Sequence, residues 1–252
     1  MKLKINHGRI IGIENQVLNP VLPTSDLSFI EDKDLYKEIR NYIKSEHRNL
    51  ENKFTFEGGV MKGSNPYLAV AVDMFFKKYH PEYRLSTQLD LEQDLEFTKG
   101  TYNDSGLALK NLTGANKEQA EHIFEQLKKR GVLEKNFPLW LNLKGLELAS
   151  DLNFDLTDES FYKTAECLNW ENGANYSKIN DFGLPKEKDS NSSRQIWTSS
   201  SNALSRAYLD RLSNLSSGSS ILDNSTDNGR VVLRRCEAPE LSQNFRKGLL
   251  TN

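Results

Sequence analysis

The sequence predicts an α+β fold. Stretches with helical periodicity and stretches with strand-like alternation do not follow one another in regular turn, which disfavours a doubly wound parallel sheet. A chain of 252 residues with 37% hydrophobic and 10% aromatic residues is long enough to bury a substantial core. We therefore expect residues 1–252 to form a single folded domain built from helices and small antiparallel sheets.

The stretch SNPYLAVAVDMFFKKYHP predicts a largely buried helix, because apolar residues cover it almost all round. Asn65 is the expected N-cap and Pro66 the first helical residue, and Pro81 ends the helix. Both ends of the helix are therefore encoded locally.

The stretch ANKEQAEHIFEQLKKRG predicts a second helix, which lies on the surface of a core. Its start resembles a capping box formed by Asn116 and Gln119, and Gly131 provides the stop. One apolar stripe recurs at helical spacing, and it consists of Ala120, Ile123, Phe124 and Leu127.

Several stretches predict strands. Leu139 to Leu156 alternate apolar and polar residues, with a kink at Gly145. Lys2 to Ile5 are expected to form a first strand, and KFTFEGG and RQIWTSS are shorter candidates. Lys186 to Ser193 are expected to form a polar loop.

Composition and charge exclude several classes of protein. A net charge of −2 lacks the basic footprint of a dedicated nucleic-acid binder, so no nucleic-acid partner is expected. Nowhere does an apolar run approach the length of a membrane span. The two cysteines, Cys167 and Cys236, make no disulfide framework and indicate a reduced intracellular setting. No signal peptide is visible, which makes the cytoplasm the default location.

The loop GGVMKGSNP lies between a strand and the first helix, where a phosphate could bind to backbone amides beside Lys62 and Ser64. However, the order is Lys-Gly-Ser and the glycine spacing does not fit a P-loop, so an ordinary helix cap is favoured. A small intracellular enzyme or nucleotide-binding protein that uses Gly58–Ser64 remains the alternative hypothesis.

Metal and catalytic motifs do not assemble. The stretch DNSTDNG resembles the start of a calcium loop, but the twelfth position from Asp223 is Arg234, where a bidentate glutamate is needed. The histidines stand apart from any second ligand at a suitable spacing. No serine or cysteine has a nucleophile's sequence context. We therefore expect no enzyme activity, no cofactor and no metal.

The segment from Thr198 to Cys236 contains no Lys, Glu, Gln, Met or Trp, although these five types make up about a quarter of the rest of the chain. A disordered linker is the ordinary interpretation of a serine-rich stretch. Linkers, however, are rich in Glu, Lys and Gln and poor in apolar anchors, whereas leucines recur through this segment.

A mutational history accounts for the omission. Randomising both adenines of an AAC or AAT codon gives sixteen codons that encode fifteen amino acids and no stop. The five amino acids that cannot be reached are Lys, Glu, Gln, Met and Trp, which is the set missing from this segment.

The chain thus resembles the variable proteins of diversity-generating retroelements, in particular the archaeal ones. Three features carry the resemblance: the strand IWTSS, the leucine-spaced pattern LSRAYLDRLSNLSS…IL…S…GRVVLRR, and the two-helix stretch KGSNPYLAVAVD…ANKEQAEHIFEQLKKRG. The second feature is the most specific of the three. Together they extend over most of the chain from about residue 55 onward.

The resemblance implies a C-type lectin fold, with two helices flanking small antiparallel sheets. It also implies that a strand near Met1 pairs with Arg230–Arg235. The implied role is that of a non-enzymatic binding protein, which displays diversified side chains on one exposed surface around residues 203–228. The implied partner is an unidentified ligand, a protein or cell-surface molecule of another organism. Such a binder would act at a cell or virion surface.

Leu204, Leu209, Leu215 and Leu222 are expected to point inward as framework. Tyr208, Arg206 and Arg211 are the expected energetic anchors of binding, since Tyr and Arg are enriched in binding hot spots. Leu212 fits either a variable or a buried position, as do Ala203 and Ala207, and Ser213 stands where an apolar residue is expected. The full set of expected ligand-binding residues is Ser205, Arg206, Tyr208, Asp210, Arg211, Leu212, Asn214, Ser216, Gly218, Ser219, Ser220, Ile221, Asp223, Asn224, Thr226, Asp227 and Asn228.

Overall fold

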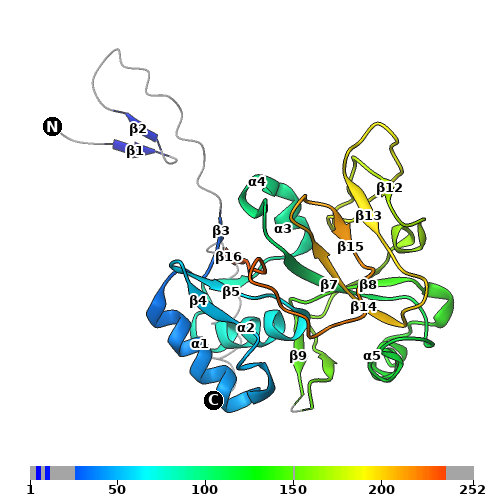
Figure 1. Ribbon diagram of the computed structural model, residues 1–252, viewed down its shortest axis with the longest axis horizontal. Coiled ribbons are helices and arrows are strands. Elements are labelled where there is room, and N and C mark those ends of the chain that lie inside the picture. Colours follow the sequence, from blue (N-terminus) through cyan, green and yellow to red (C-terminus); the bar gives the residue numbers. More distant parts are fainter. Residues whose placement is uncertain (1–3, 7–8, 12–25, 150, 237–252) are drawn as a thin grey trace.

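The computed structural model describes residues 26–149 and 151–236, together with the backbone of residues 4–6 and 9–11. It confirms the mixed α+β architecture (Figure 1). The helices of the described part are α1 (Lys33–Glu46), α2 (Pro66–Tyr79), α3 (Gln88–Gln93), α4 (Leu95–Thr98) and α5 (Lys117–Lys128).

The largest sheet of the described part is curled and has the order β11-β8-β7-β14-β15-β13-β12, antiparallel throughout except for the parallel pair β13–β15. A smaller sheet has the order β3-β16-β6, and β4 pairs with β5 as a hairpin. The strands are β1 (Lys4–Asn6), β2 (Arg9–Ile11), β3 (Leu27–Ser28), β4 (Thr55–Glu57), β5 (Val60–Lys62), β6 (Tyr83–Leu85), β7 (Asn103–Leu109), β8 (Leu139–Asn142), β9 (Leu146–Leu148), β10 (Phe154–Leu156), β11 (Tyr162–Thr164), β12 (Ala174–Asn175), β13 (Gln195–Trp197), β14 (Leu204–Leu209), β15 (Leu215–Ser216) and β16 (Leu233–Arg235).

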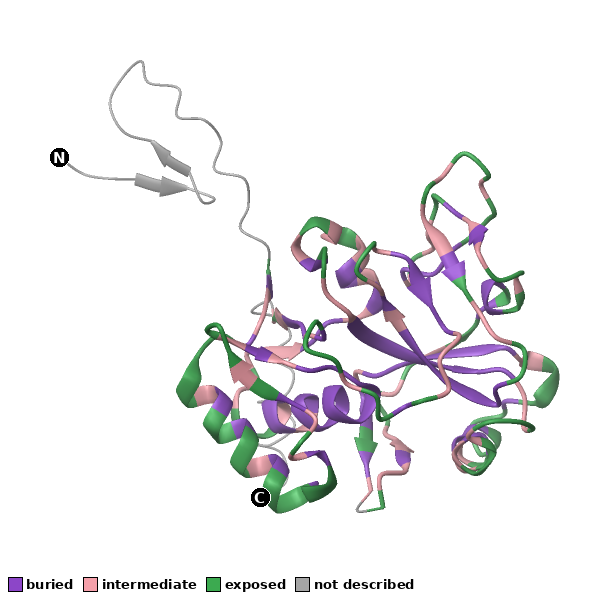
Figure 2. Cartoon of the chain, viewed as in Figure 1, coloured by how far each residue is buried: buried purple, intermediate pink, exposed green. Residues whose placement is uncertain are grey.

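The strands at the centre of the sheet are buried on both faces (Figure 2). Along β7, Leu107 and Leu109 belong to one hydrophobic cluster, together with α2 and α5, whereas Ala108 belongs to a second cluster on the opposite face. This alternation is the period of two that a strand imposes on its side chains. The sheet therefore separates two cores, and β14, which carries much of the predicted variable segment, pairs directly with β7.

The first predicted helix is confirmed. Helix α2 runs from Pro66 to Tyr79, and the Asn65 side chain accepts a hydrogen bond from the Leu68 amide at 2.8 Å. Its residues from Pro66 to Asp73 are all buried, as the nearly continuous apolar pattern predicts.

The second predicted helix is confirmed, but its predicted cap is wrong. Helix α5 has the expected buried stripe of Ala120, Ile123, Phe124 and Leu127. Asn116, however, adopts a left-handed backbone (φ 60°), and its side chain makes no capping hydrogen bond. Its side chain instead reaches the C-terminal segment, as described below.

Two expectations about the N-terminal part need correction. The strand at Arg230–Arg235 pairs with β3 and β6, because β16 lies between them, rather than with a strand near Met1. Part of the expected strand Lys2–Ile5 lies outside the described residues, and β1 pairs with β2. The fold also contains a third long helix, α1, whose buried Tyr36, Ile39 and Ile43 add to the core beside α2.

Candidate ligand-binding site

The predicted variable segment is folded rather than linker-like. It forms β14, a hairpin to β15 and a long loop that returns towards the start of α2 (Figure 1). All four framework leucines are buried as predicted: Leu204, Leu209 and Leu215 are 0% exposed and Leu222 is 4% exposed. The segment is thus anchored in the core at regular intervals.

The structure divides the predicted site residues into three groups. Exposed positions are Arg211, Leu212, Ile221, Asp223, Asn224, Thr226, Asp227 and Asn228. Half-buried positions are Tyr208, Asp210, Gly218, Ser219 and Ser220. The remaining positions, contrary to the expectation of one exposed surface, are buried: Ser205, Arg206, Asn214 and Ser216. Their side chains bond to the protein itself or pack within it, so they do not face a ligand.

The ambiguous positions are resolved by burial. Leu212 is 78% exposed at the tip of the β14–β15 hairpin, so it is not a buried anchor. Ala203 and Ala207 are 0% exposed and belong to the framework. Ser213 has a φ of 62°, which disfavours the apolar residue expected there because bulky side chains rarely adopt the left-handed region.

The framework holds this segment mainly through its backbone carbonyls. Asn116 Nδ2 donates to the carbonyl oxygens of Leu204 (2.8 Å) and Ser220 (2.7 Å), which ties the strand to the start of the loop. Four more groups outside the segment donate hydrogen bonds to its carbonyl oxygens. These bonds are Arg194 Nε to Ser213 O, Asn202 Nδ2 to Gly218 O, Asn65 Nδ2 to Asp223 O, and the Tyr102 amide to Asn228 O. Every residue type provides a carbonyl, so these bonds do not depend on the side chains that they hold.

Arg206 lies at the centre of the buried polar network beneath the loop. Its guanidinium pairs with both carboxylate oxygens of Asp104, at 2.8 and 2.6 Å. It also donates to the carbonyl oxygens of Asn224 (2.7 Å) and Ser64 (3.2 Å). A register shift in the β7–β14 pair leaves Ser105 without a residue opposite it in β14, and such a bulge re-aims neighbouring side chains. Arg206 is therefore a structural residue, not the exposed binding anchor that was predicted.

Tyr208 is half-buried and held in place on two sides. The Arg206 guanidinium carbon lies 4.7 Å from the centroid of its ring, and the Tyr102 ring packs against it at 6.0 Å. An aromatic ring that is fixed before binding loses little conformational freedom when a ligand arrives. Of the three expected anchors, Tyr208 and the exposed Arg211 remain available to a ligand.

The hairpin tip is rigid although it is exposed. Asp210 Oδ1 accepts hydrogen bonds from the amides of Leu212 (2.8 Å) and Asn214 (3.0 Å). Arg194, which anchors Ser213, forms a bidentate pair with Glu92 at 2.7 and 2.8 Å. Leu212 is thus exposed on a loop whose conformation is held by the Asp210 carboxylate and by Arg194.

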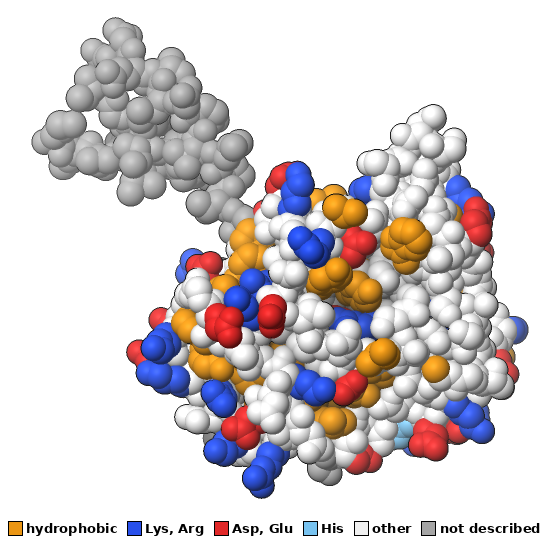
Figure 3. Space-filling model, in the orientation of Figure 1, with side chains coloured by type: hydrophobic (Ala, Val, Ile, Leu, Met, Phe, Trp, Pro, Cys, Tyr) orange, Lys and Arg blue, Asp and Glu red, His pale blue; other side chains and the backbone are white. Residues whose placement is uncertain are grey.

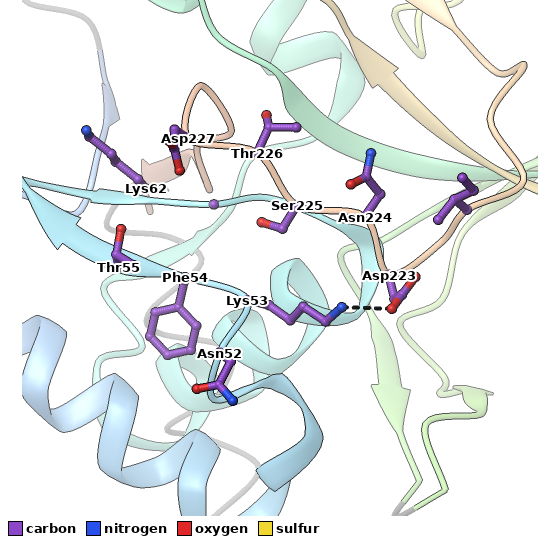
Figure 4. Close-up of a pocket in the computed structure, with 12 residues that line it drawn as sticks. Asn52, Lys53, Phe54, Thr55, Lys62, Asp223, Asn224, Ser225, Thr226 and Asp227 are labelled. Atoms are coloured by element: carbon purple, nitrogen blue, oxygen red, sulfur yellow. Dashed lines mark hydrogen bonds and ion pairs between the residues drawn. The ribbon is translucent and has the colours of Figure 1, made fainter.

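A cavity of about 440 Å³ lies between the returning loop and the β4–β5 region (Figure 4). One wall comes from outside the predicted segment and consists of Asn52, Lys53, Phe54, Thr55, Lys62 and Gly63. The other wall comes from the segment itself and consists of Ile221, Asp223, Asn224, Ser225, Thr226 and Asp227. Of the first wall, the sequence singled out only Lys62 and Gly63, as part of the Gly58–Ser64 loop, and it gave no functional signal for residues 52–55.

The alternative site at Gly58–Ser64 consists of a β-hairpin turn, strand β5 and two residues that bond to the returning loop. Gly58 and Gly59 form the turn between β4 and β5, so this stretch is a hairpin rather than a phosphate loop. The Gly63 amide donates to Gly229 O, and the Ser64 amide donates to Ser225 Oγ. The amides of Gly63 and Ser64 are therefore engaged by the returning loop.

The surface around the segment is largely polar. In the space-filling view, charged side chains gather over the part that carries α1 and the β4–β5 hairpin, whereas hydrophobic side chains lie near β15 and the right-hand side of this face is mostly neither charged nor apolar (Figure 3). Within the described ranges, no cluster of three or more His, Cys, Asp or Glu residues could hold a metal ion. No helix in the described part combines the length and apolar character that a membrane crossing requires.

No protein-family model, curated protein or solved structure matches this chain.

Proposed function

We propose that the chain is a non-enzymatic ligand-binding protein, whose exposed C-terminal segment is diversified by adenine-directed mutagenesis from a retroelement. The proposal includes a fold of the C-type lectin kind. Two independent observations support it: the five residue types missing from 198–236, and the way in which the framework holds this segment.

The observation that carries the proposal is the anchoring through carbonyls. A diversified surface must keep its backbone conformation whatever side chains it receives. Donors outside residues 203–228, such as Asn65, Asn116 and Arg194, bond to main-chain oxygens of the segment. Its leucines fill the core beneath. The remaining exposed side chains can therefore change without loss of the bonds that fix the loop.

The side chains at exposed and half-buried positions also suit binding. Tyr208 provides a rigid aromatic surface, and the neighbouring Ser, Asn and Gly residues provide adaptable hydrogen bonding, a combination typical of antibody paratopes. The ligand we infer is a protein or cell-surface molecule of another organism.

The test is randomisation of two sets of codons in a displayed library, read by resistance to protease. The exposed set is Arg211, Leu212, Ile221, Asp223, Asn224, Thr226, Asp227 and Asn228. We expect most clones of this set to stay folded. The matched set is Ser205, Arg206, Asn214 and Ser216, where we expect most clones to unfold. Equal loss of folding in the two sets would contradict the proposal.

A genomic comparison tests the mutational part separately. A near-identical template repeat should lie near a reverse transcriptase gene. The codons of Asp210, Asn214 and Asn224 should differ from that repeat, if at all, only where the repeat has adenine. Differences at other bases would remove retroelement diversification from the proposal.

A further inference from the structure

The two walls of the 440 Å³ cavity differ in charge (Figure 4). The wall outside the predicted segment carries Lys53 and Lys62, and Lys62 Nζ is paired with Glu57 Oε2 at 3.0 Å. The wall within the segment carries Asp223 and Asp227. The cationic wall is therefore a constant part of the site, whereas the charge of the facing wall depends on positions that the proposed function treats as diversified.

Lys53 and Asp223 join the two walls. Lys53 Nζ lies 2.8 Å from Asp223 Oδ2, and their side chains are 32% and 57% exposed. Ion pairs with this degree of exposure contribute little to stability, so a competing carboxylate can replace Asp223. The pair also shows that a carboxylate in this cavity can reach the Lys53 ammonium at hydrogen-bonding distance.

The identity of residue 223 has little influence on the backbone of its wall. Asn65 Nδ2 donates to Asp223 O at 3.3 Å, Arg206 holds Asn224 O, and the Ser64 amide bonds Ser225 Oγ at 3.0 Å. None of these bonds uses the Asp223 side chain. A change at 223 therefore alters the charge of the cavity and leaves its walls in place.

We propose that this cavity binds an acidic segment of a protein ligand through Lys53, and that residue 223 decides whether Lys53 is free to do so. With Asp223, the chain's own carboxylate competes with the ligand. An uncharged residue at 223 leaves the ammonium open. Ile221 lines the same cavity and is 59% exposed, so a peptide that places an aliphatic side chain beside a carboxylate matches both features.

The experiment uses fluorescence anisotropy with a labelled, capped peptide of alternating Glu and Leu, and with the same peptide carrying Gln in place of Glu. The proteins are the full chain, Asp223→Asn, Asp227→Asn, Lys53→Met and the double variant of Lys53→Met with Asp223→Asn. Asp227→Asn is the matched control, because it makes the same charge change on the same wall but does not release Lys53. Circular dichroism checks that each variant is folded.

We expect Asp223→Asn to bind the Glu peptide about threefold to fivefold more tightly than Asp227→Asn does, with a difference that shrinks at high salt. Lys53→Met should remove the preference for Glu over Gln in both backgrounds. Equal binding by the two Asp variants, or no measurable binding of the Glu peptide by Asp223→Asn, would overturn the proposal. So would Lys53-dependent binding of an acidic sugar oligomer without binding of the peptide.

The assignment of residue 223 as a diversified position rests on the proposed function, but the peptide measurement does not. If the peptide fails to bind while the exposed positions tolerate randomisation, only the cavity proposal is lost. If the peptide binds while randomisation of the exposed positions unfolds the chain, the proposal of a diversified segment is rejected and the proposal of an acidic-peptide site stands.

Discussion

Replacement of Arg206 by alanine should destabilise the fold strongly, although Arg206 belongs to the segment that we propose to be diversified. The side chain is 5% exposed, and it pairs with Asp104 through two hydrogen bonds of 2.8 and 2.6 Å. Without it, Asp104 keeps the Ser64 hydroxyl at 2.6 Å, while the carbonyl oxygens of Asn224 and Ser64 lose a donor. Breaking a buried ion pair by removing one partner costs about 3–5 kcal/mol.

The assay is urea unfolding followed by tryptophan fluorescence and circular dichroism. The expected loss corresponds to a fall in the melting temperature of roughly 6–20 °C for a chain of this size. Arg211→Ala is the matched control, since Arg211 is exposed on the same segment and its loss should change stability by less than about 0.5 kcal/mol. A loss below about 1 kcal/mol for Arg206→Ala, or one equal to that of Arg211→Ala, would refute the structural role assigned to Arg206.

Three further predictions concern the framework. Asn116→Gly should lower the free energy of unfolding in urea by about 1–3 kcal/mol, because two carbonyls lose their donor. Asn116→Ala should lower it by about 1 kcal/mol more, because alanine disfavours the φ of 60° at this position. Gly106→Ala should lower the free energy of unfolding in urea by about 3 kcal/mol or more, because the added Cβ would lie 2.2 Å from Trp140 Nε1. Gly218→Ala is the control and should be tolerated, because the nearest atom to its Cβ would be 3.5 Å away. Burial lowers the pKa of His47 below 6.5, against the smaller opposing effect of Glu46, so the unfolded chain binds a proton at a higher pH than the folded one. Stability should therefore fall as the pH drops through 6.5 towards the folded-state pKa, and His47→Leu should show a shallower fall in pH-dependent urea titrations.

The parts of the fold that the sequence predicted are those encoded within a few residues. Helix α2 is one such part, because Asn65, Pro66 and the apolar run after them specify its start and its burial locally. The four buried leucines are a second such part, because linkers are poor in apolar residues and leucines that recur in a polar segment indicate packing against a core. The expected capping box at Asn116 failed for a complementary reason: the Asn116 side chain bonds to residues 88 and 104 positions away, which local spacing does not record.

The sequence predicted that the segment is folded and anchored by leucines, but it did not predict which of its polar side chains are buried. Ser205 and Asn214 are polar, and nothing beside them in the sequence marks them as buried. Each is buried because a distant partner satisfies it: Ser205 Oγ bonds Ser217 O, and Asn214 Oδ1 accepts from the Gln195 amide. The wall that contains Lys53 was missed because it is brought to the segment by tertiary contacts alone. The missing residue types thus drew attention to the segment, and only the packing shows which of its side chains are exposed.

Arg206 is the position where diversification and folding conflict, and this conflict yields a last prediction. Several other side chains that hold carbonyls of the loop, those of Asn65, Asn116, Arg194 and Asn202, lie outside residues 203–228, so mutagenesis confined to the segment cannot remove them. Arg206 lies inside it, and most residues reachable from an asparagine codon could not replace its contacts with Asp104 and Asn224. If the segment is diversified, the template should therefore carry the Arg206 codon unchanged, without adenine at its first two bases. Sequencing of the template repeat tests this prediction. An AAC or AAT codon at that position would contradict it, because the fold would then have to tolerate loss of the Arg206 contacts with Asp104 and Asn224.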